Sequence, residues 1–136
     1  VDQNQFNQIL KQTGVDQMLE EMNATLDTQI IENGKNLSGG QKQRLSIARM
    51  LIGKAHVLLV DEATSSLDVL STKQIDELLL SLDQTVINVT HKLDPEILKQ
   101  YDQILVLNQG HLVEVGDYAS LLQQHHYFYN LVNNVS

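Results

Sequence analysis

Two short clusters of residues could do chemistry together: a glycine-rich helix start and, further along the chain, a pair of adjacent acids. Ser38 and Gln41 have the spacing of a capping box, in which the hydroxyl accepts from a backbone N–H and the amide reaches back. Between them stand Gly39 and Gly40, and each glycine costs about 1 kcal/mol relative to alanine inside a helix. Bare N–H groups at the positive end of a helix dipole bind phosphate, which would explain the glycines. Taken alone, a glycine-rich cap without a ligand is the simpler interpretation.

The acids Asp61 and Glu62 follow the apolar run VLLV at 57–60, which predicts a strand buried on both faces. Open α/β sheets bind ligands at the carboxyl ends of such strands. One carboxylate could hold a hydrated Mg²⁺ while the other orients or deprotonates a water molecule. An acidic turn without chemistry is the alternative. It becomes a poor explanation once the glycine-rich helix start before it and the loop ATSSL ending at Asp68 after it are included.

Several elements must position these clusters. The helix that begins at Ser38 is expected to run to about Gly53, with Lys42, Arg44 and Arg49 on a solvated face without a catalytic role. The other expected elements, in chain order, are a helix over 2–13 ended by Gly14, a short helix capped by Asp16, a loop over 23–36, a helix capped by Asp68, a strand over 85–89, a short helix opened by Asp94-Pro95, a third buried strand over 104–107, a hairpin loop at 108–110, a return strand over 112–115 and two small helices within 117–135.

His91 comes just after the strand over 85–89. A lone histidine is more often a surface or structural residue than a catalytic one. If the two strands are parallel neighbours, however, His91 is expected near Glu62, where an imidazole could contact a γ-phosphate or the attacking water. His125 and His126 are interpreted as exposed tail residues, because no acid or cysteine has a spacing suitable for a shared metal.

Composition sets limits on the function. A chain of 136 residues fits one domain, and 17 acids against 9 bases give a net charge of −8, which argues against a nucleic-acid surface. There is no cysteine to form a disulfide, no apolar run long enough to span a membrane, and no pattern of a signal peptide at the N-terminus.

The order and spacing of these motifs resemble those of the ATP-binding-cassette (ABC) ATPases. Leu37 to Gln41 is similar to the family's signature motif, and His56 to Asp61 is similar to its Walker B strand. Glu62 resembles its catalytic glutamate, the segment ending at Asp68 its D-loop, and His91 its switch histidine.

The resemblance implies an α/β fold, the C-terminal part of a P-loop (RecA-like) ATPase core with a mostly parallel sheet, plus a remnant of the family's helical subdomain. Residues 1–53 would contain that remnant with the signature helix, and residues 54–136 the core part. The pattern G-x-x-x-x-G-K-[ST] does not occur in these residues, so the resemblance covers the signature half of the domain.

The function implied by the resemblance is ATP hydrolysis that drives export, performed by the complete protein at the cytoplasmic face of the cell membrane. Ser38, Gly39, Gly40 and Gln41 would bind the γ-phosphate of ATP held by a second nucleotide-binding domain. Asp61 would hold Mg²⁺ through water, Glu62 would polarise the attacking water, and His91 would sense the γ-phosphate. Asp68 would link the two sites. The partners would be that second domain, as a homo- or heterodimer, and the transmembrane domains.

Some residues favour an exporter and others depart from the usual pattern. Ala63 and the segment from Gly116 resemble exporters, whereas importers more often carry proline at the position of Ala63. Ala55 stands where the family often has proline, and Lys92 where exporters commonly have arginine.

Two alternatives stay open. The first is a soluble ABC ATPase of the chromosome-organising or DNA-repair type, in which a long coiled coil precedes the signature half of the domain. Residues 1–31 lack the sustained heptads that a coiled coil requires. A catalytically silent interaction module is the second alternative, and measurement of ATP binding would separate it from an enzyme.

The missing half also has physical consequences. A micromolar dissociation constant for ATP needs a binding free energy of about 8 kcal/mol. Without the phosphate loop and the adenine platform, the 136-residue chain is expected to bind ATP far more weakly than that. In the related core, the phosphate-loop strand lies between the strands at 85–89 and 104–107. We therefore expect these two strands not to pair, and the isolated chain to self-associate or to be only marginally stable.

Overall fold

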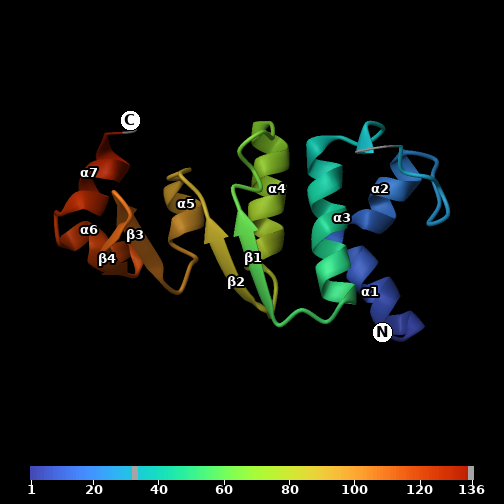
Figure 1. Ribbon diagram of the computed structural model, residues 1–136, viewed down its shortest axis with the longest axis horizontal. Coiled ribbons are helices and arrows are strands. Elements are labelled where there is room, and N and C mark those ends of the chain that lie inside the picture. Colours follow the sequence, from blue (N-terminus) through green and yellow to red (C-terminus); the bar gives the residue numbers. More distant parts are fainter. Residues whose placement is uncertain (32–33, 135–136) are drawn as a thin grey trace. The chain divides into compact units, whose positions relative to one another are not determined.

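The computed structural model describes residues 1–31 and 34–134, and the chain forms two compact units, residues 1–90 and 91–136 (Figure 1). The first unit contains the helices α1 (Gln3–Thr13), α2 (Val15–Glu21), α3 (Gly39–Ile52) and α4 (Val69–Leu80) and the strands β1 (Val57–Asp61) and β2 (Thr85–Val89). The second contains α5 (Pro95–Leu98), the strands β3 (Ile104–Asn108) and β4 (His111–Gly116), α6 (Tyr118–Gln123) and α7 (Tyr127–Asn133).

The first two helices meet at Gly14. The helix α1 has a capping box made by Asp2 and Gln5, and it ends as predicted at Gly14, whose φ of 68° is left-handed. Asp16 was expected to cap the next helix, and this prediction is wrong: α2 already begins at Val15, with Gly14 as its N-cap. The same glycine ends one helix and opens the next, so no position remains for a side-chain cap between them.

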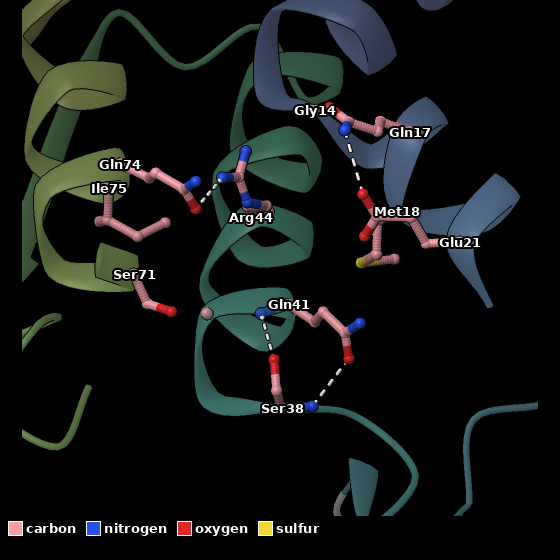
Figure 2. A pocket seen from close by; sticks show the side chains of 11 residues that line it. Gly14, Gln17, Met18, Glu21, Ser38, Gln41, Arg44, Ser71, Gln74 and Ile75 are labelled. Carbon is pink, nitrogen blue, oxygen red and sulfur yellow. Dashed lines mark hydrogen bonds between the residues drawn. The ribbon is translucent and has the colours of Figure 1, made fainter. Parts of the chain in front are cut away.

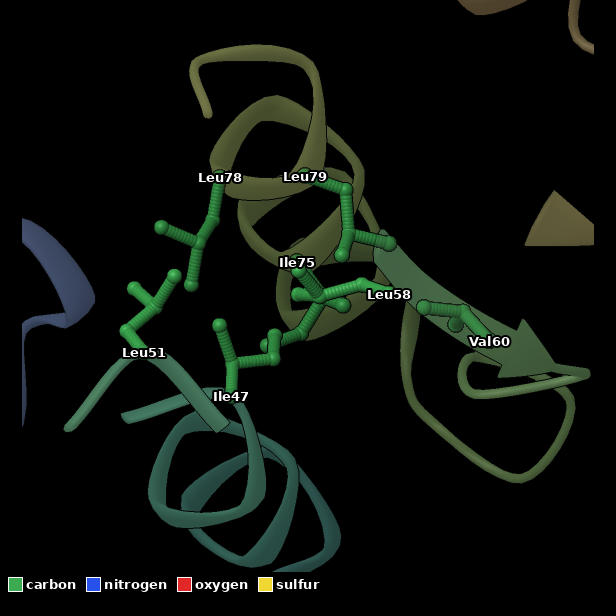
Figure 3. Packing of buried hydrophobic residues seen from close by; sticks show 7 residues of the cluster. All are labelled: Ile47, Leu51, Leu58, Val60, Ile75, Leu78 and Leu79. Atoms are coloured by element: carbon green, nitrogen blue, oxygen red, sulfur yellow. The ribbon is translucent and has the colours of Figure 1, made fainter. Parts of the chain in front are cut away.

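The strands β1 and β2 pair in parallel, from Val57 opposite Thr85 to Asp61 opposite Val89. One face of this pair packs against the helices α3 and α4 in a closed apolar core (Figure 3). Leu58 and Ile75 are both fully buried there. The remaining buried members of the cluster are Ile47, Leu51, Val60, Leu78 and Leu79.

The other face of the pair is apolar and exposed. Val57 and Leu59 on β1 are 53% and 68% exposed, and Ile87 and Val89 on β2 are 51% and 47% exposed. The prediction that the strand over 57–60 is buried on both faces is therefore wrong for this chain. The physical reason is that α3 and α4 cover only the side that carries Leu58 and Val60.

The second unit is an antiparallel hairpin packed on short helices. The hairpin turns at Gln109 and Gly110, both with positive φ (47° and 77°), as a two-residue loop requires. Its core contains Leu98, Val106, Tyr118, Leu121 and Phe128.

Two details of this unit differ from expectation. The strand over 104–107 was expected to be buried, but Leu105 and Leu107 are 59% and 65% exposed and only Val106 on that stretch is buried. An acid that the sequence patterns did not single out, Glu114, is buried on β4, where its Oε2 accepts from the backbone N–H of Phe128 at 2.6 Å. It thereby ties the start of α7 to the hairpin.

The predicted α/β class is confirmed, with a parallel strand pair beside helices. The four described strands form two separate sheets, β1–β2 and β3–β4, in line with the expectation that residues 85–89 and 104–107 do not pair directly. The functional division into residues 1–53 and 54–136 stays a prediction. No helix within residues 1–31 and 34–134 is long and apolar enough to cross a membrane.

Candidate functional site

The glycine-rich cluster forms the first turn of α3 (Figure 2). The N-cap is Ser38, whose Oγ accepts from the backbone N–H of Gln41 at 3.2 Å, while Gln41 Oε1 accepts from the backbone N–H of Ser38 at 2.8 Å. The predicted capping box is confirmed. Because a capped helix start fixes the direction of its backbone N–H groups, this turn presents a rigid positive end of a helix dipole.

The structure places the two glycines beside the segment around Asp68, a proximity that sequence patterns could not show. A Cβ at Gly39 would lie 2.6 Å from Cδ2 of Leu67, and one at Gly40 would lie 3.4 Å from Cβ and Oγ of Ser71. Both neighbours belong to the segment around Asp68. An added Cβ at Gly39 would force the side chain of Leu67 to move, whereas one at Gly40 would only touch Ser71. The start of α3 thus lies close to the start of α4.

The acid pair stands at the carboxyl end of β1. Asp61 is the last residue of the strand, lies opposite Val89, and is exposed. Glu62 has a φ of 46°, a left-handed conformation that costs a non-glycine residue of the order of 1 kcal/mol. Its backbone N–H donates to the carbonyl of Val89 at 2.8 Å. The chain thus leaves the sheet at Glu62 while staying tied to the end of β2.

Asp68 is the N-cap of α4, as predicted. Its Oδ1 accepts from the backbone N–H of Ser71 at 2.9 Å, and its Oδ2 accepts from the Ser71 hydroxyl at 2.7 Å. These two hydrogen bonds, first the one from the hydroxyl, lower the pKa of the Asp68 carboxyl below its ordinary value of 3.8. The carboxylate is therefore charged at neutral pH and sits at the positive end of α4.

The structure brings most of the predicted site residues into one compact unit. Ser38, Gly39, Gly40 and Gln41 on α3 lie with Asp61, Glu62 and Asp68 within residues 1–90. His91 is exposed, follows β2, and is the first residue of the second unit. Its predicted proximity to Glu62 stays a prediction.

Arg44 is the residue that sequence reasoning misjudged. It was assigned to a solvated face of the helix, but it is half-buried, and its guanidinium donates to the backbone carbonyl of Thr13 at 3.1 Å and to Gln74 Oε1 at 2.8 Å. The periodicity of the helix could not indicate this role, because both hydrogen bonds of Arg44 go to other helices, α1 and α4. The guanidinium borders a polar pocket of about 210 Å³ between α2, α3 and α4 (Figure 2). Ser38, Gln41 and Ser71 are among the other residues that line this pocket.

The donor chemistry fits a hydrated magnesium ion rather than a protein-enclosed metal. Within the described part of the chain, no group of three or more histidine, aspartate or glutamate side chains could hold a metal ion. Mg²⁺ keeps several waters and takes one or two protein carboxylates together with phosphate oxygens. The exposed carboxylate of Asp61 meets that requirement.

Comparison with known proteins identifies the family. The model of the family described as "ABC transporter" matches residues 1–65. Over 116 residues, 85% of this chain, the sequence is 42% identical to the transport/processing ATP-binding protein ComA of Streptococcus pneumoniae, of which it covers 16%. It is 45% identical over 115 residues to the ATP-dependent lipid A-core flippase of Albidiferax ferrireducens, which corresponds to 83% of this chain and 19% of that protein.

A solved structure shows the same relationship. The fold matches that of a bacterial Atm1-family ABC exporter with ATP bound, with a TM-score of 0.82 and 30% identity, over 99% of this chain and 24% of that one. The chain thus spans less than a quarter of the length of each of these three proteins. It belongs to the ABC transporter family, with the sequence and fold of part of an exporter-type nucleotide-binding domain.

Proposed function

We propose that this chain supplies the signature, Walker B, D-loop and switch-histidine elements of an ATPase that drives export across a membrane. The observation that carries the proposal is the arrangement within residues 1–90. The capped, glycine-containing start of α3 lies against the segment around Asp68. The acid pair Asp61-Glu62 stands at the carboxyl end of the parallel strand β1 in the same unit. The similarity to exporter ATP-binding proteins supports the same assignment.

In this proposal the first turn of α3 binds the γ-phosphate of an ATP molecule held by a second nucleotide-binding domain. The donors in this proposal are the backbone N–H groups at Gly39 and Gly40 and the hydroxyl of Ser38, since the helix dipole favours an anion there. Ser38 and Gly39 are exposed, whereas Gly40 is buried. Gln41 maintains the turn through its bond to Ser38.

The acids and the histidine act on the other ATP, the one held by their own domain. Asp61 would hold a hydrated Mg²⁺, which would supply positive charge beside the phosphate groups. Glu62 orients the attacking water and accepts its proton, and the left-handed backbone at Glu62 directs the chain away from the sheet edge. His91 contacts the γ-phosphate, and Asp68 connects the two shared sites. The complete protein would act at the cytoplasmic face of the membrane, together with its transmembrane domains.

The proposal is tested by Glu62→Gln in the complete protein. The amide preserves the shape of the side chain but accepts no proton, and a positioned general base is worth about 10² to 10⁴ in rate. We expect ATP turnover to fall by that factor while ATP binding persists, so that the variant accumulates with ATP bound. Glu77→Gln, on the exposed face of α4, is the matched control and should keep wild-type turnover. Turnover by Glu62→Gln within a few-fold of wild type would remove Glu62 from the mechanism.

A further inference from the structure

Arg44 joins three helices of the first unit. Its Nη1 donates to the backbone carbonyl of Thr13, at the end of α1, over 3.1 Å. Its Nη2 donates to Oε1 of Gln74, on α4, over 2.8 Å (Figure 2). The planar fork of a guanidinium can serve two acceptors in different directions, which a lysine ammonium on a flexible stem cannot do with the same geometry.

The end of α1 is shaped to receive this guanidinium. Gly14 has a left-handed φ of 68°, and a Cβ at this position would overlap Nη1 of Arg44. A larger residue at this position would therefore strain the left-handed backbone and would have to displace the guanidinium of Arg44. Thr13 is fully buried, and its carbonyl belongs to the negative end of α1, where a cation is favoured.

The two hydrogen bonds of Arg44 lie one helical turn C-terminal to the proposed phosphate-binding turn of α3. Gly40 and Arg44 are four residues apart on α3 and so share a face, as do Ser71 and Gln74 on α4. Gly40 packs against Ser71, and Arg44 bonds to Gln74, which gives two successive contacts between the helices. Ser71 in turn binds Asp68. The first turns of α3 and α4 thus contact each other at Gly40 and Ser71. One turn further along, the hydrogen bond from Arg44 to Gln74 links the same two helices.

We propose that Arg44 is a positioning residue for the shared ATP site: it sets the first turn of α3 relative to Asp68 and to the α1–α2 pair. This inference rests on the proposed function, because it gives Arg44 a part in the same site. A displacement of about 1 Å at a reacting centre can cost about 10² in rate, so a change in how α3 is held reduces kcat. We expect the KM for ATP to change little, because the hydrogen bonds of Arg44 go to Thr13 and Gln74 and not to Asp61, Glu62 or Asp68.

Four variants of the complete protein test the proposal. Arg44→Lys keeps the charge but not the fork, and Arg49→Lys makes the same change at an exposed position on the same helix. Gln74→Leu removes the acceptor on α4, whereas Gln74→Glu keeps an acceptor oxygen. We expect Arg44→Lys and Gln74→Leu to lower kcat about tenfold with KM within twofold of wild type. Arg49→Lys and Gln74→Glu should stay within twofold in both constants.

The outcomes separate positioning from general stability and from failure of the proposed function. If Arg44→Lys lowers kcat no more than Arg49→Lys, or if Gln74→Glu is as impaired as Gln74→Leu, the inference is wrong. If Arg44→Lys does not fold, the comparison of kcat between Gln74→Leu and Gln74→Glu still tests the inference.

If the wild-type protein hydrolyses no ATP, the proposed function fails, and hydrogen exchange of the amides at residues 39–42 tests the positioning separately. That exchange should be faster in Arg44→Lys and unchanged in Arg49→Lys. Equal exchange in the two variants would overturn the positioning role.

Discussion

At the scale of single residues, the candidate site depends on two helix caps whose hydrogen bonds were foreseeable and on two glycines whose packing was not. The spacing of Ser38 and Gln41 predicted the capping box that the structure contains, because capping involves residues three apart in the chain. The contacts of Gly39 and Arg44 lie with residues far away in the chain, which no local pattern encodes.

The Asp68 cap gives a prediction about titration. The Ser71 hydroxyl is the first cause of the lowered pKa of Asp68, so Ser71→Ala should move that pKa upward toward the ordinary value of 3.8. NMR titration of the carboxyl in wild type and variant measures this shift. Ser120→Ala, beside the similar cap Asp117, is the control and should leave the pKa of Asp68 unchanged.

The sign of the linked stability follows from the direction of the shift. A carboxyl whose pKa is lower in the folded state stabilises the fold above its unfolded pKa, and this contribution is lost as pH falls through the folded pKa. The loss for Asp68 is therefore expected below pH 3.8, and neutral pH leaves the cap intact. An unchanged pKa in Ser71→Ala would show that the hydroxyl does not hold the carboxylate.

At the scale of elements, the strand β1 presents two different faces to its surroundings. Leu58 is fully buried in the core with α3 and α4, whereas its neighbour Leu59 is 68% exposed. In the 136-residue chain, Leu58→Ala should lower the free energy of unfolding by about 2–5 kcal/mol or leave the chain unfolded. Leu59→Ala should change it by about 0.5 kcal/mol or less. Chemical denaturation of both variants measures the difference, and equal losses would contradict the one-sided core.

The sequence predicted these elements well because their signals are local: the caps Asp68 and Asp94 and the helix-ending Gly14. The hairpin was predicted with a loop over 108–110, and in the structure Asn108 still belongs to β3, so only Gln109 and Gly110 form the loop. The sequence could not predict the exposure of Leu59 or Leu105. An apolar run such as VLLV indicates a strand that is buried on both faces when its whole domain is present, and periodicity does not say which neighbours are there. The wrong cap at Asp16 has another origin, since two helices share Gly14.

At the scale of the whole molecule, the uncovered apolar face and the two separate sheets predict how the 136-residue chain behaves in solution. Val57, Leu59, Ile87 and Val89 form one contiguous side of the parallel pair, and unpaired strand edges favour association. We expect sedimentation analysis to show association that increases with concentration. Leu59→Lys should weaken it by placing a charge on that face, and Lys73→Glu on the exposed face of α4 should not. A wild-type chain that stays monomeric and stable would show that this face needs no cover.

The central proposal is that the first turn of α3 serves an ATP molecule held by a second nucleotide-binding domain, and a homodimer allows the most direct test. Ser38→Asp keeps a good N-cap but places a negative charge where the γ-phosphate would bind, and Ser38→Asn is the uncharged control. Purified mixed dimers of the complete protein can carry Ser38→Asp in one copy and Glu62→Gln in the other, or both substitutions in the same copy.

The two arrangements give opposite results for shared and unshared sites. If sites are shared, separate substitutions leave one site with an intact Ser38 and an intact Glu62, whereas both substitutions in one copy damage both sites. The measurement is ATP turnover of the two mixed dimers. We predict that the dimer with separated substitutions keeps turnover and that the dimer with both in one copy loses it. The reverse pattern, with turnover only when both substitutions share one copy, would contradict the account.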